Sequence, residues 1–588
     1  MILSTGSGGR RSEGSGGRGS TGSGSGGRRR RAALAGIAGA AVLALAVSSC
    51  SEESGGSSDG QSKGPGTTTL IAYTGQAGDY QINFNPFSPS DIGGLGAIFE
   101  PLFFINKAKV SDPKPLLGTA YSFNDDGTQL TVTTREGVKW TDGQPFTAKD
   151  VAFTFNLIKK SQALNTWGFD GQVEAADDTH VVFTWPKPAY VIAPDVISQV
   201  PIVPEHIWKD AGDPVNYVAK DPVGTGAYKL GTFKPQAFTV VANPDYWGGE
   251  PKIKTIRRLS LSGNQAGADG IAAGTIDWQT GPIPDIQNTH KNFPNYDKFT
   301  AWQNQMVLAS CANEALGCTG PQTDPAVRQA LYYAMDRTQL NNLAFDKTAN
   351  TVSPSFALTP TQDQWMSPDV NPKTAPATAD PAKARSLLEG AGWIKGKDGM
   401  YSKNGKPLTL TVEVVTGWTD YITGLQAITA QAKAAGITVE TSQSSWNGWS
   451  DKKNKGEFQL VIDSLYQGPA PDPYYVYTYF FTTANTTKVG KTSGLNYGRF
   501  SDPAVDSAVA QLKGLDFSET AARQAQFGII QKELVEKMPY IPVLTAGTTS
   551  IWNVTKFTGW PSDTNLYAFP AIWSRLDSAE IFKALSPA

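Results

Sequence analysis

Cysteine and histidine are scarce in this 588-residue sequence, which contains three of each. Zinc sites need several Cys or His ligands at short, regular spacings, and these residues show no such spacing. A Cys-His nucleophile is not indicated either, because no Cys is convincingly matched with a His. The sequence therefore predicts no metal site and no cofactor. The residues are Cys50, Cys311, Cys318, His180, His206 and His290.

Long hydrophobic runs are also nearly absent. Only residues 32–47 approach membrane character, and this stretch is too short and too N-terminal for an ordinary spanning helix. A transporter with many membrane spans is therefore excluded. With 40% hydrophobic and 18% charged residues, the chain has the balance of a folded protein made of several domains or lobes.

Clustered positive charge is missing from most of the chain. The formal net charge is −2, but the first 49 residues hold seven Arg and one Glu. The remainder carries 44 basic and 52 acidic residues, a formal charge of −8. Binding to phosphate backbones requires clustered Lys and Arg, so this charge balance argues against nucleic acid as a partner.

The N-terminus has the pattern of an export signal. Residues 4–31 are almost all Gly, Ser, Thr and Arg, residues 32–47 are apolar, and Val-Ser-Ser-Cys follows at 47–50. This order resembles a bacterial lipoprotein signal peptide, which is cut before a Cys that receives a diacylglycerol. The resemblance implies removal of residues 1–49 and a lipid anchor on Cys50, at the extracytoplasmic face of the cell membrane. An ordinary secretory signal that happens to end near a Cys is the alternative.

Residues 50–68 follow as a polar segment rich in Ser, Gly and Thr, which predicts a flexible tether. Cys311 and Cys318 are the other two cysteines. An exported chain tolerates disulfides and a loop of this length can be closed by one, so we predict that they pair. Two unpaired buried thiols are the alternative.

Apolar segments bounded by Gly, Pro and Asn alternate with helical patterns, which indicates an α/β fold. Asp-Pro pairs at 324, 380 and 502 predict three helix starts, because Asp caps free amides and Pro is tolerated at the first helical position. Thr147, with Asp150 three residues later, predicts a fourth start. These motifs are explained by folding alone.

Five segments in order resemble the solute-binding proteins of peptide-type ABC importers, also called extracellular solute-binding proteins of family 5. The first runs from a strand through Arg-x-Gly-Val-x-Trp into Asp-Gly-x-Pro-Phe-Thr-Ala-x-Asp-Val. Together they span nearly all of the chain after the tether. They lie at 130–158, 221–253, 324–337, 380–393 and 536–544.

The resemblance implies an α/β, periplasmic-binding-protein-like fold with two lobes, a hinge of two crossing segments and an extra subdomain. Lobe I would comprise residues 69–112, 222–300 and 548–588. The extra subdomain would comprise 113–221, and lobe II 301–547. The implied protein is a monomer that captures a small solute and passes it to ABC permease and ATPase subunits.

Such a protein needs an enclosed cleft with aromatic faces and fixed polar groups, and no catalytic group. Candidate ligand-binding residues are those in polar surroundings, and the resemblance places Trp446 in the cleft. The candidates are Trp418, Trp446, Trp449, Tyr466, Asp472 and Tyr474.

The ligand is either an oligosaccharide or a short peptide. Peptide binders of the family hold the ligand's ammonium with an Asp at the position of Gly468, and some carry an Arg at the position of Ile462. Asp463 and Asp472 lie nearby and would fill the role if the alignment shifts. Segments 468–475 and 557–573 resemble oligosaccharide binders, although Trp560, Tyr567 and Trp573 are equally explained as packing residues. We therefore prefer an oligosaccharide.

Two other functions compete with solute delivery. A lipid-anchored hydrolase would use two carboxylates, but no pair stands out among the 53 acidic residues. A receptor that senses the ligand without transporting it has the same sequence features.

Overall fold

The computed structural model describes residues 66–588 apart from 78, 89–90, 110, 161–163, 166–168 and 494. The side chains of residues 76, 77, 446 and 447 are also not described. The predicted signal segment, Cys50 and the tether up to residue 65 therefore lie outside the described residues.

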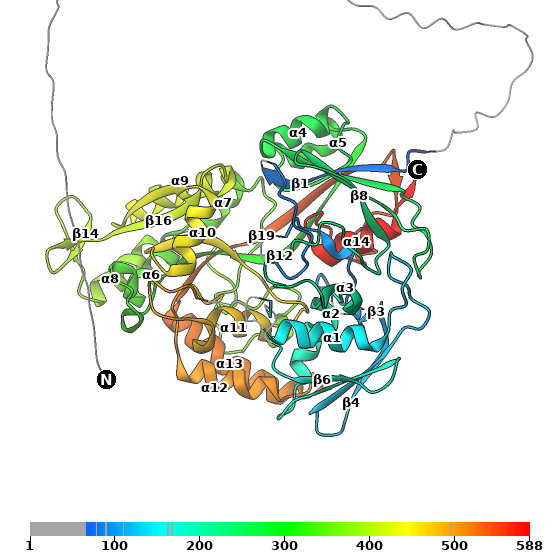
Figure 1. Ribbon diagram of the computed structural model, residues 1–588. Coiled ribbons are helices and arrows are strands. Elements are labelled where there is room, and N and C mark those ends of the chain that lie inside the picture. The colour runs from blue at the N-terminus through cyan, green and yellow to red at the C-terminus, as the bar shows by residue number, and fades with distance from the viewer. Residues whose placement is uncertain are drawn as a thin grey trace, which may run out of the picture. The chain divides into compact units, whose positions relative to one another are not determined.

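A ten-stranded mixed sheet runs through the described chain (Figure 1). Its middle is antiparallel, while β16 pairs in parallel with β17 and β18, and β1 with β10 and β11. The order is β17 (Thr438–Ser444), β16 (Thr409–Val415), β18 (Leu460–Leu465), β12 (Tyr296–Ser310), β19 (Tyr540–Asn553), β11 (Trp278–Thr280), β1 (Thr69–Ala77), β10 (Thr255–Leu261), β9 (Ala237–Ala242) and β8 (Tyr228–Lys234).

Strands β12 and β19 are the two longest and pair with each other almost from end to end. The pairing runs from Tyr296 opposite Asn553 to Ala309 opposite Tyr540, with irregularities after Trp302 and after Met306. One end of β12 pairs with β18 and one end of β19 pairs with β11. The pair therefore links the two halves of the sheet.

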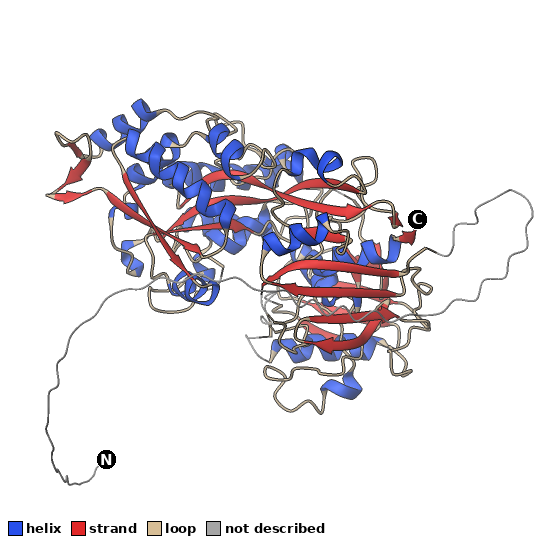
Figure 2. Ribbon diagram, turned by 90° about the horizontal axis from the view of Figure 1, so that it is seen from above, coloured by secondary structure: helices blue, strands red, loops and turns tan. Residues whose placement is uncertain are grey.

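Smaller sheets and helices complete the fold, with helices packed along the strands (Figure 2). A four-stranded sheet holds β4 (Gly118–Phe123), β5 (Gln129–Thr134), β7 (His180–Thr184) and β6 (Gln172–Ala175). The short strands are β13 (Ile394–Lys395), β14 (Tyr401–Lys403), β15 (Lys406–Pro407), β2 (Phe103–Phe104), β3 (Lys114–Pro115), β20 (Phe557–Thr558) and β21 (Ser586–Pro587). The helices are α1 (Ala148–Lys159), α2 (Ala193–Gln199), α3 (Glu205–Trp208), α4 (Asn264–Ala272), α5 (Thr289–Asn292), α6 (Pro325–Ala334), α7 (Arg337–Ala344), α8 (Pro381–Gly390), α9 (Thr419–Ala434), α10 (Trp446–Lys455), α11 (Tyr474–Phe481), α12 (Pro503–Lys513), α13 (Thr520–Lys537) and α14 (Arg575–Ala584).

All four predicted helix starts are confirmed. The carboxylates of Asp324, Asp380 and Asp502 accept hydrogen bonds from first-turn amides of α6, α8 and α12, with Pro as the next residue in each case. Thr147 and Asp150 form a reciprocal capping box at the start of α1. Each cap satisfies amides that have no partner within the helix.

Three large hydrophobic cores lie along the sheet. The first joins Leu70 and Ile256 of the main sheet with Leu130 and Phe155 of residues 113–221. The second lies around Leu308 and Ile428, and the third around Tyr475 and Phe527, with residue Val191 also in the third. The predicted extra subdomain thus shares cores with its neighbours.

The described residues from 66 onward pack as one compact unit. The lobe boundaries remain a prediction. Within the described residues, no helix combines the length and apolar character needed to cross a bilayer.

Candidate functional site

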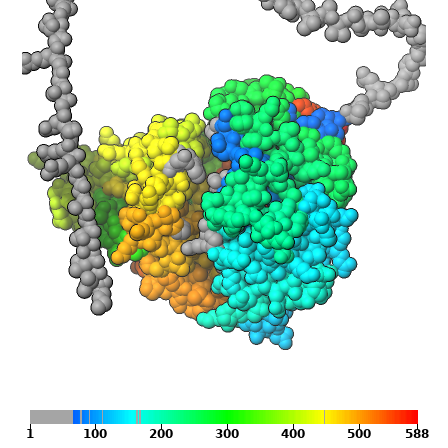
Figure 3. Space-filling model, in the orientation of Figure 1, coloured from blue at the N-terminus to red at the C-terminus, as the bar shows by residue number. Residues whose placement is uncertain are grey.

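A cavity of about 900 Å³ lies beside the middle of the β12–β19 pair. Its lining comes both from segments assigned to lobe I (β1, β11 and α4) and from segments assigned to lobe II (β18 and the helices α7 and α9). The surface is hollowed between the yellow region around α9 and the green region around α4 (Figure 3). This volume is in the range of small-molecule sites in proteins.

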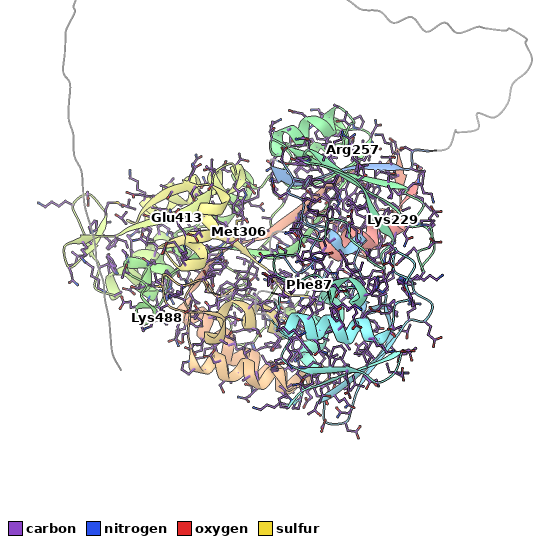
Figure 4. The ribbon with its side chains drawn as sticks, viewed as in Figure 1. Phe87, Lys229, Arg257, Met306, Glu413 and Lys488 are labelled. Carbon is purple, nitrogen blue, oxygen red and sulfur yellow. A yellow bond between two sulfur atoms is a disulfide. The ribbon has the colours of Figure 1, made fainter. Side chains whose placement is uncertain are left out.

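The strands β12 and β19 form one side of the cavity through Asn304, Met306, Ala546 and Gly547. Met306 lies on β12 between the two halves of the sheet (Figure 4). Gly547 is needed here because a Cβ at this position would meet the backbone oxygen of Thr348 at 2.0 Å. The close approach of these two backbones defines part of the cavity wall.

Aromatic rings form a second wall. Trp418 and Tyr421, at the start of α9, meet edge to face at 5.4 Å, and Tyr421 contacts Phe345 at 6.3 Å. All three rings line the cavity. Trp449 does not line it, but packs against Trp418 at 5.1 Å and holds that ring in place. Flat apolar faces of this kind suit sugar rings and other planar or apolar groups.

Three carboxylates accompany these rings: Asp346, Asp420 and Asp463. Asp463 is paired with Lys453 at 2.9 Å, and the same ammonium lies 4.3 Å from the centre of the Trp449 ring. Burial raises the pKa of Asp420 above its ordinary value, and backbone amides at the start of α9 oppose this shift. Asp420 thus differs from Asp463 in its electrostatic surroundings.

The opposite wall is rich in small polar groups. Thr280 shares a short hydrogen bond with the hydroxyl of Ser550 and accepts one from the amide of Ile572 at 3.0 Å. Trp573 is 42% exposed and also lines this wall. The other polar lining residues here are Thr74, Asn264, Thr548 and Thr549.

The charged residues that line the cavity are all acidic. Among the described residues that line the cavity there are three Asp and no Lys, Arg or His. An anionic solute would be repelled by these carboxylates, of which Asp463 is offset by Lys453, so the cavity suits a neutral or a cationic solute. Hydroxyls and aromatic faces together can hold such a molecule without reacting with it.

The structure places the predicted tryptophans close together. Trp418 lines the cavity and Trp449 lies directly behind it. Trp446 begins α10, and its side chain lies outside the described residues. Its role in ligand binding remains a prediction.

Tyr466, Asp472 and Tyr474 are not among the residues that line this cavity. Tyr466 stacks on Tyr479 with 8° between the rings. Asp472 is buried, binds Arg523 at 2.6 Å and accepts a hydrogen bond from the amide of Tyr474 at 2.8 Å. Packing and pairing account for these contacts, and ligand contact by the three residues remains a prediction.

Two positions carry ligand-binding side chains in peptide binders of the family. In this chain they hold Gly468 and Ile462, which pack against neighbouring residues. Gly468 has φ of 98°, and a Cβ there would meet the Tyr475 ring at 2.2 Å. Ile462 is fully buried in the second hydrophobic core. A side chain of Asp at residue 468 therefore does not fit this structure.

The C-terminal aromatic residues divide into two groups. Trp560 stacks on Trp552 at 5.1 Å, and the Tyr567 hydroxyl donates to the carbonyl of Gly559 at 2.7 Å. Both contacts are internal packing. Only Trp573 of this group lines the cavity.

Sequence reasoning did not single out Asp420 or Tyr421 as site residues. The sequence feature that points to them is the segment Gly-Trp-Thr-Asp-Tyr at 417–421, which closely follows the apolar strand 409–415. Residues after a strand commonly lie at the edge of a sheet, where sites form.

Cys311 and Cys318 are joined by a disulfide beside the end of β12. In the part of the chain that the structure describes, no three Cys, His, Asp or Glu side chains are arranged to hold a metal ion.

Known proteins resemble this chain in sequence and in fold. Protein XP55 of Streptomyces lividans is 26% identical over 511 residues, which are 86% of this chain and 88% of that protein. The periplasmic oligopeptide-binding protein of Thermotoga maritima, with mannohexaose bound, matches with a TM-score of 0.79 and 23% identity, covering 89% of this chain and 99% of the other. The Bacillus subtilis oligopeptide-binding protein AppA, in complex with a nonapeptide, matches with a TM-score of 0.72 and 21% identity over 90% of this chain and 100% of the other.

The structural likenesses confirm the predicted fold, that of a two-lobed α/β periplasmic binding protein. The profile of the bacterial extracellular solute-binding proteins, family 5, matches residues 112–487. The family resemblance seen in the sequence is therefore confirmed. The chain belongs to the bacterial extracellular solute-binding proteins of family 5.

Proposed function

We propose that this protein is the solute-binding component of an ABC importer of the peptide and oligosaccharide class. It captures a small solute in the cavity beside β12 and β19 and hands it, chemically unaltered, to permease and ATPase subunits. The main support is the cavity itself, whose aromatic and polar walls come from segments on both sides of the sheet. A ligand that contacts both walls favours the closed arrangement over the open one.

An oligosaccharide is the ligand we favour. The side chains of Trp418 and Trp573 that line the cavity, together with the threonine hydroxyls, match the apolar faces and hydroxyl rims of sugars. A short peptide is the second candidate, and the observation that favours it is the carboxylate of Asp420. The fold alone does not decide, because the Thermotoga protein was seen with mannohexaose and the Bacillus protein with a nonapeptide.

The protein acts outside the cytoplasm as a lipid-anchored monomer, with the anchor on Cys50. The support is the sequence pattern of residues 4–50 and the extracellular character of the family. Mass spectrometry of the N-terminal peptide from membranes tests this proposal. A diacylglyceryl group on Cys50 supports it, and a free thiol at residue 50 contradicts it.

A thermal-shift screen tests the binding function, using protein that lacks residues 1–50. This form retains every described residue of the compact unit. Cello-, xylo- and chito-oligosaccharides are compared with di- to pentapeptides. A ligand present well above its dissociation constant raises the melting temperature, because it binds only the folded protein. Shifts with peptides alone would refute the preference for sugar.

The rival hydrolase function is tested in the same samples. Chromogenic glycosides and peptides are incubated with the protein, and release of the chromophore is followed. A binding protein gives the rate of the buffer blank. Turnover above that rate would contradict the proposed function.

A further inference from the structure

A small three-stranded sheet, residues 394–407, projects from the body of the protein beside β16. It consists of β13, β14 and β15, and it stands out from the rest of the fold in both ribbon views (Figure 1 and Figure 2). The strands pair in antiparallel order, β13 with β14 and β14 with β15. Asn404 and Gly405 form the second turn, and both have positive φ, as a tight hairpin turn requires. We call this element the projecting sheet.

The base of the projecting sheet is fixed to the second hydrophobic core. Trp393, directly before β13, and Tyr401 of β14 are both buried in that core. The Trp393 indole donates a hydrogen bond to Asp324 at 3.2 Å, and the Tyr401 hydroxyl donates one to Glu389 at 2.6 Å. The sheet is therefore held at its base, while most of its other residues are exposed.

Lysine is the commonest charged residue of the projecting sheet, which holds four Lys and one Asp. Lys403 is paired with Asp324 at 3.3 Å. The one acid, Asp398, accepts a hydrogen bond from the amide of Met400 at 3.1 Å. The other three lysines are exposed, and no carboxylate in the described part of the chain forms an ion pair with them. They are Lys395, Lys397 and Lys406.

The same sheet carries the most exposed large apolar side chain among the residues that the structure describes. Ile394 is 70% exposed, and Lys395 is the next residue in the chain. A single exposed apolar residue is ordinary by itself. Together with unpaired lysines it is typical of segments that contact membranes, where ammonium groups meet lipid phosphates and apolar side chains enter the headgroup region.

The charge of the projecting sheet is opposite to that of the chain as a whole. After residue 49 the chain carries 44 basic and 52 acidic residues. An anionic surface repels such a chain overall, so attraction to that surface requires a local region of positive charge. The three unpaired lysines of the projecting sheet provide one.

A lipid surface fits the projecting sheet better than a protein partner does. A stable protein interface buries about 800 Å² on each side and has a well-packed apolar centre. The projecting sheet has short strands and, among its described residues, one large exposed apolar side chain. A bilayer requires no such match of shape, because separate lysines attract separate phosphate groups.

We propose that the projecting sheet binds the surface of an anionic lipid bilayer through its three unpaired lysines, with Ile394 entering the headgroup region. The inference goes beyond solute binding, and the proposed lipid anchor only brings the bilayer within reach. The projecting sheet leads directly into β16, near one end of the ten-stranded sheet, whereas residue 66 lies just before β1, toward the other end. Anchor and projecting sheet would together align the long sheet with the membrane.

Vesicle co-sedimentation tests the proposal on protein lacking residues 1–50, so that no lipid anchor contributes. One set of vesicles is phosphatidylcholine alone, and the other is an equimolar mixture of phosphatidylcholine and phosphatidylglycerol. At low ionic strength we expect binding to the mixed vesicles only, and we expect added salt to weaken it by screening the charges. Binding that is no stronger to mixed than to neutral vesicles overturns the proposal.

The test variant combines Lys395→Gln, Lys397→Gln and Lys406→Gln. Its affinity for the mixed vesicles should fall by about tenfold or more, because each lysine near an anionic surface adds to the attraction. An unchanged affinity overturns the proposal. An unchanged melting temperature shows that the variant is folded.

The matched control removes three exposed lysines of residues 113–221 and so changes the net charge by the same amount. It combines Lys187→Gln, Lys209→Gln and Lys220→Gln. The control should bind the mixed vesicles as the unchanged protein does. Equal losses in the two variants would mean that overall charge governs binding, and they overturn the role of the projecting sheet.

Polyglutamate distinguishes a lipid surface from an acidic protein. Unchanged protein that binds polyglutamate as tightly as it binds the mixed vesicles overturns the choice of a bilayer. Solute binding is measured separately, by the thermal shift with oligosaccharides and peptides in the absence of vesicles. The test variant should show the same thermal shifts as the unchanged protein, so failure of one proposal leaves the other standing.

Discussion

The side-chain amide of Gln287 donates a hydrogen bond of 2.7 Å to the backbone carbonyl of Asp346. Asp346 and Ile286, the neighbour of Gln287, both line the cavity, so the bond crosses from one wall to the other. Lys298 holds the other end of the Gln287 amide group at 2.8 Å.

Gln287→Ala removes this bridge. Because a hydrogen bond of this type contributes about 0.5–1.5 kcal/mol, the ligand should dissociate several-fold faster. Surface plasmon resonance measures the dissociation rate. Gln265→Ala is the control, since the side-chain hydrogen bond that Gln265 makes in the described structure lies within α4, to Asp269. Equal dissociation rates of the two variants would show that the bridge does not hold the cavity closed.

Trp418→Ala removes the central ring of the aromatic wall. Lost stacking should weaken binding of the preferred ligand by about 1–3 kcal/mol, measured by calorimetry. Tyr121→Ala serves as the control, because Tyr121 is an exposed aromatic residue of β4 that does not line the cavity. A ligand bound equally well by both variants would exclude Trp418 from the site.

Asp195 should make stability depend on pH. Burial raises the pKa of Asp195 to about 7, although Tyr479 donates a hydrogen bond to it at 3.1 Å. The folded state therefore binds this proton more tightly than the unfolded state does. The contribution of Asp195 to stability is present at acidic pH and is lost as the pH rises through the folded pKa.

Asp195→Asn should cancel that loss. Urea unfolding of both proteins at pH 4 and pH 8 measures the effect, with the variant gaining stability relative to the unchanged protein at pH 8 by a few kcal/mol. Other titrating groups are common to both proteins and cancel in the difference. The same stability difference at both pH values would contradict the assignment.

Arg523→Met leaves Asp472 buried without its partner. Removing one member of a buried ion pair typically costs about 3–5 kcal/mol, and the unfolding free energy should fall by this amount. The double variant Arg523→Met with Asp472→Asn should recover much of the loss, because no uncompensated charge remains. A double variant as unstable as the single one would show that Arg523 stabilises the fold through packing on Trp365 and Phe527 instead.

Local features of the fold were predictable from the sequence. Asp324, Asp380 and Asp502 cap the helices that their Asp-Pro pairs indicate, because capping depends on neighbours in the chain. The family resemblance supplied the two-lobed architecture, which propensity alone does not reveal. The discontinuous order of the ten-stranded sheet depends on contacts between distant segments.

The site was less predictable, because its geometry also depends on contacts between segments that are distant in the chain. Asp472 looked like a ligand-binding acid, but its surroundings are set by Arg523, 51 residues later in the chain. Asp420 was overlooked because a carboxylate in the first turn of a helix is common and its cavity is formed by distant strands. Gly468 shows the converse, because its φ of 98° and the nearby Tyr475 ring together explain why this position has no side chain.

Strands β12 and β19 form one hydrogen-bonded ribbon, so any swing between the two halves of the sheet has to be absorbed as twist and bend of that ribbon. A hydrogen-bonded strand pair of this kind resists bending and twisting away from the geometry that it adopts at rest. In the proposed closure around a ligand, part of the binding free energy would go into bending and twisting this ribbon. A substitution that stiffens the ribbon, far from any ligand atom, would therefore weaken capture and speed up release.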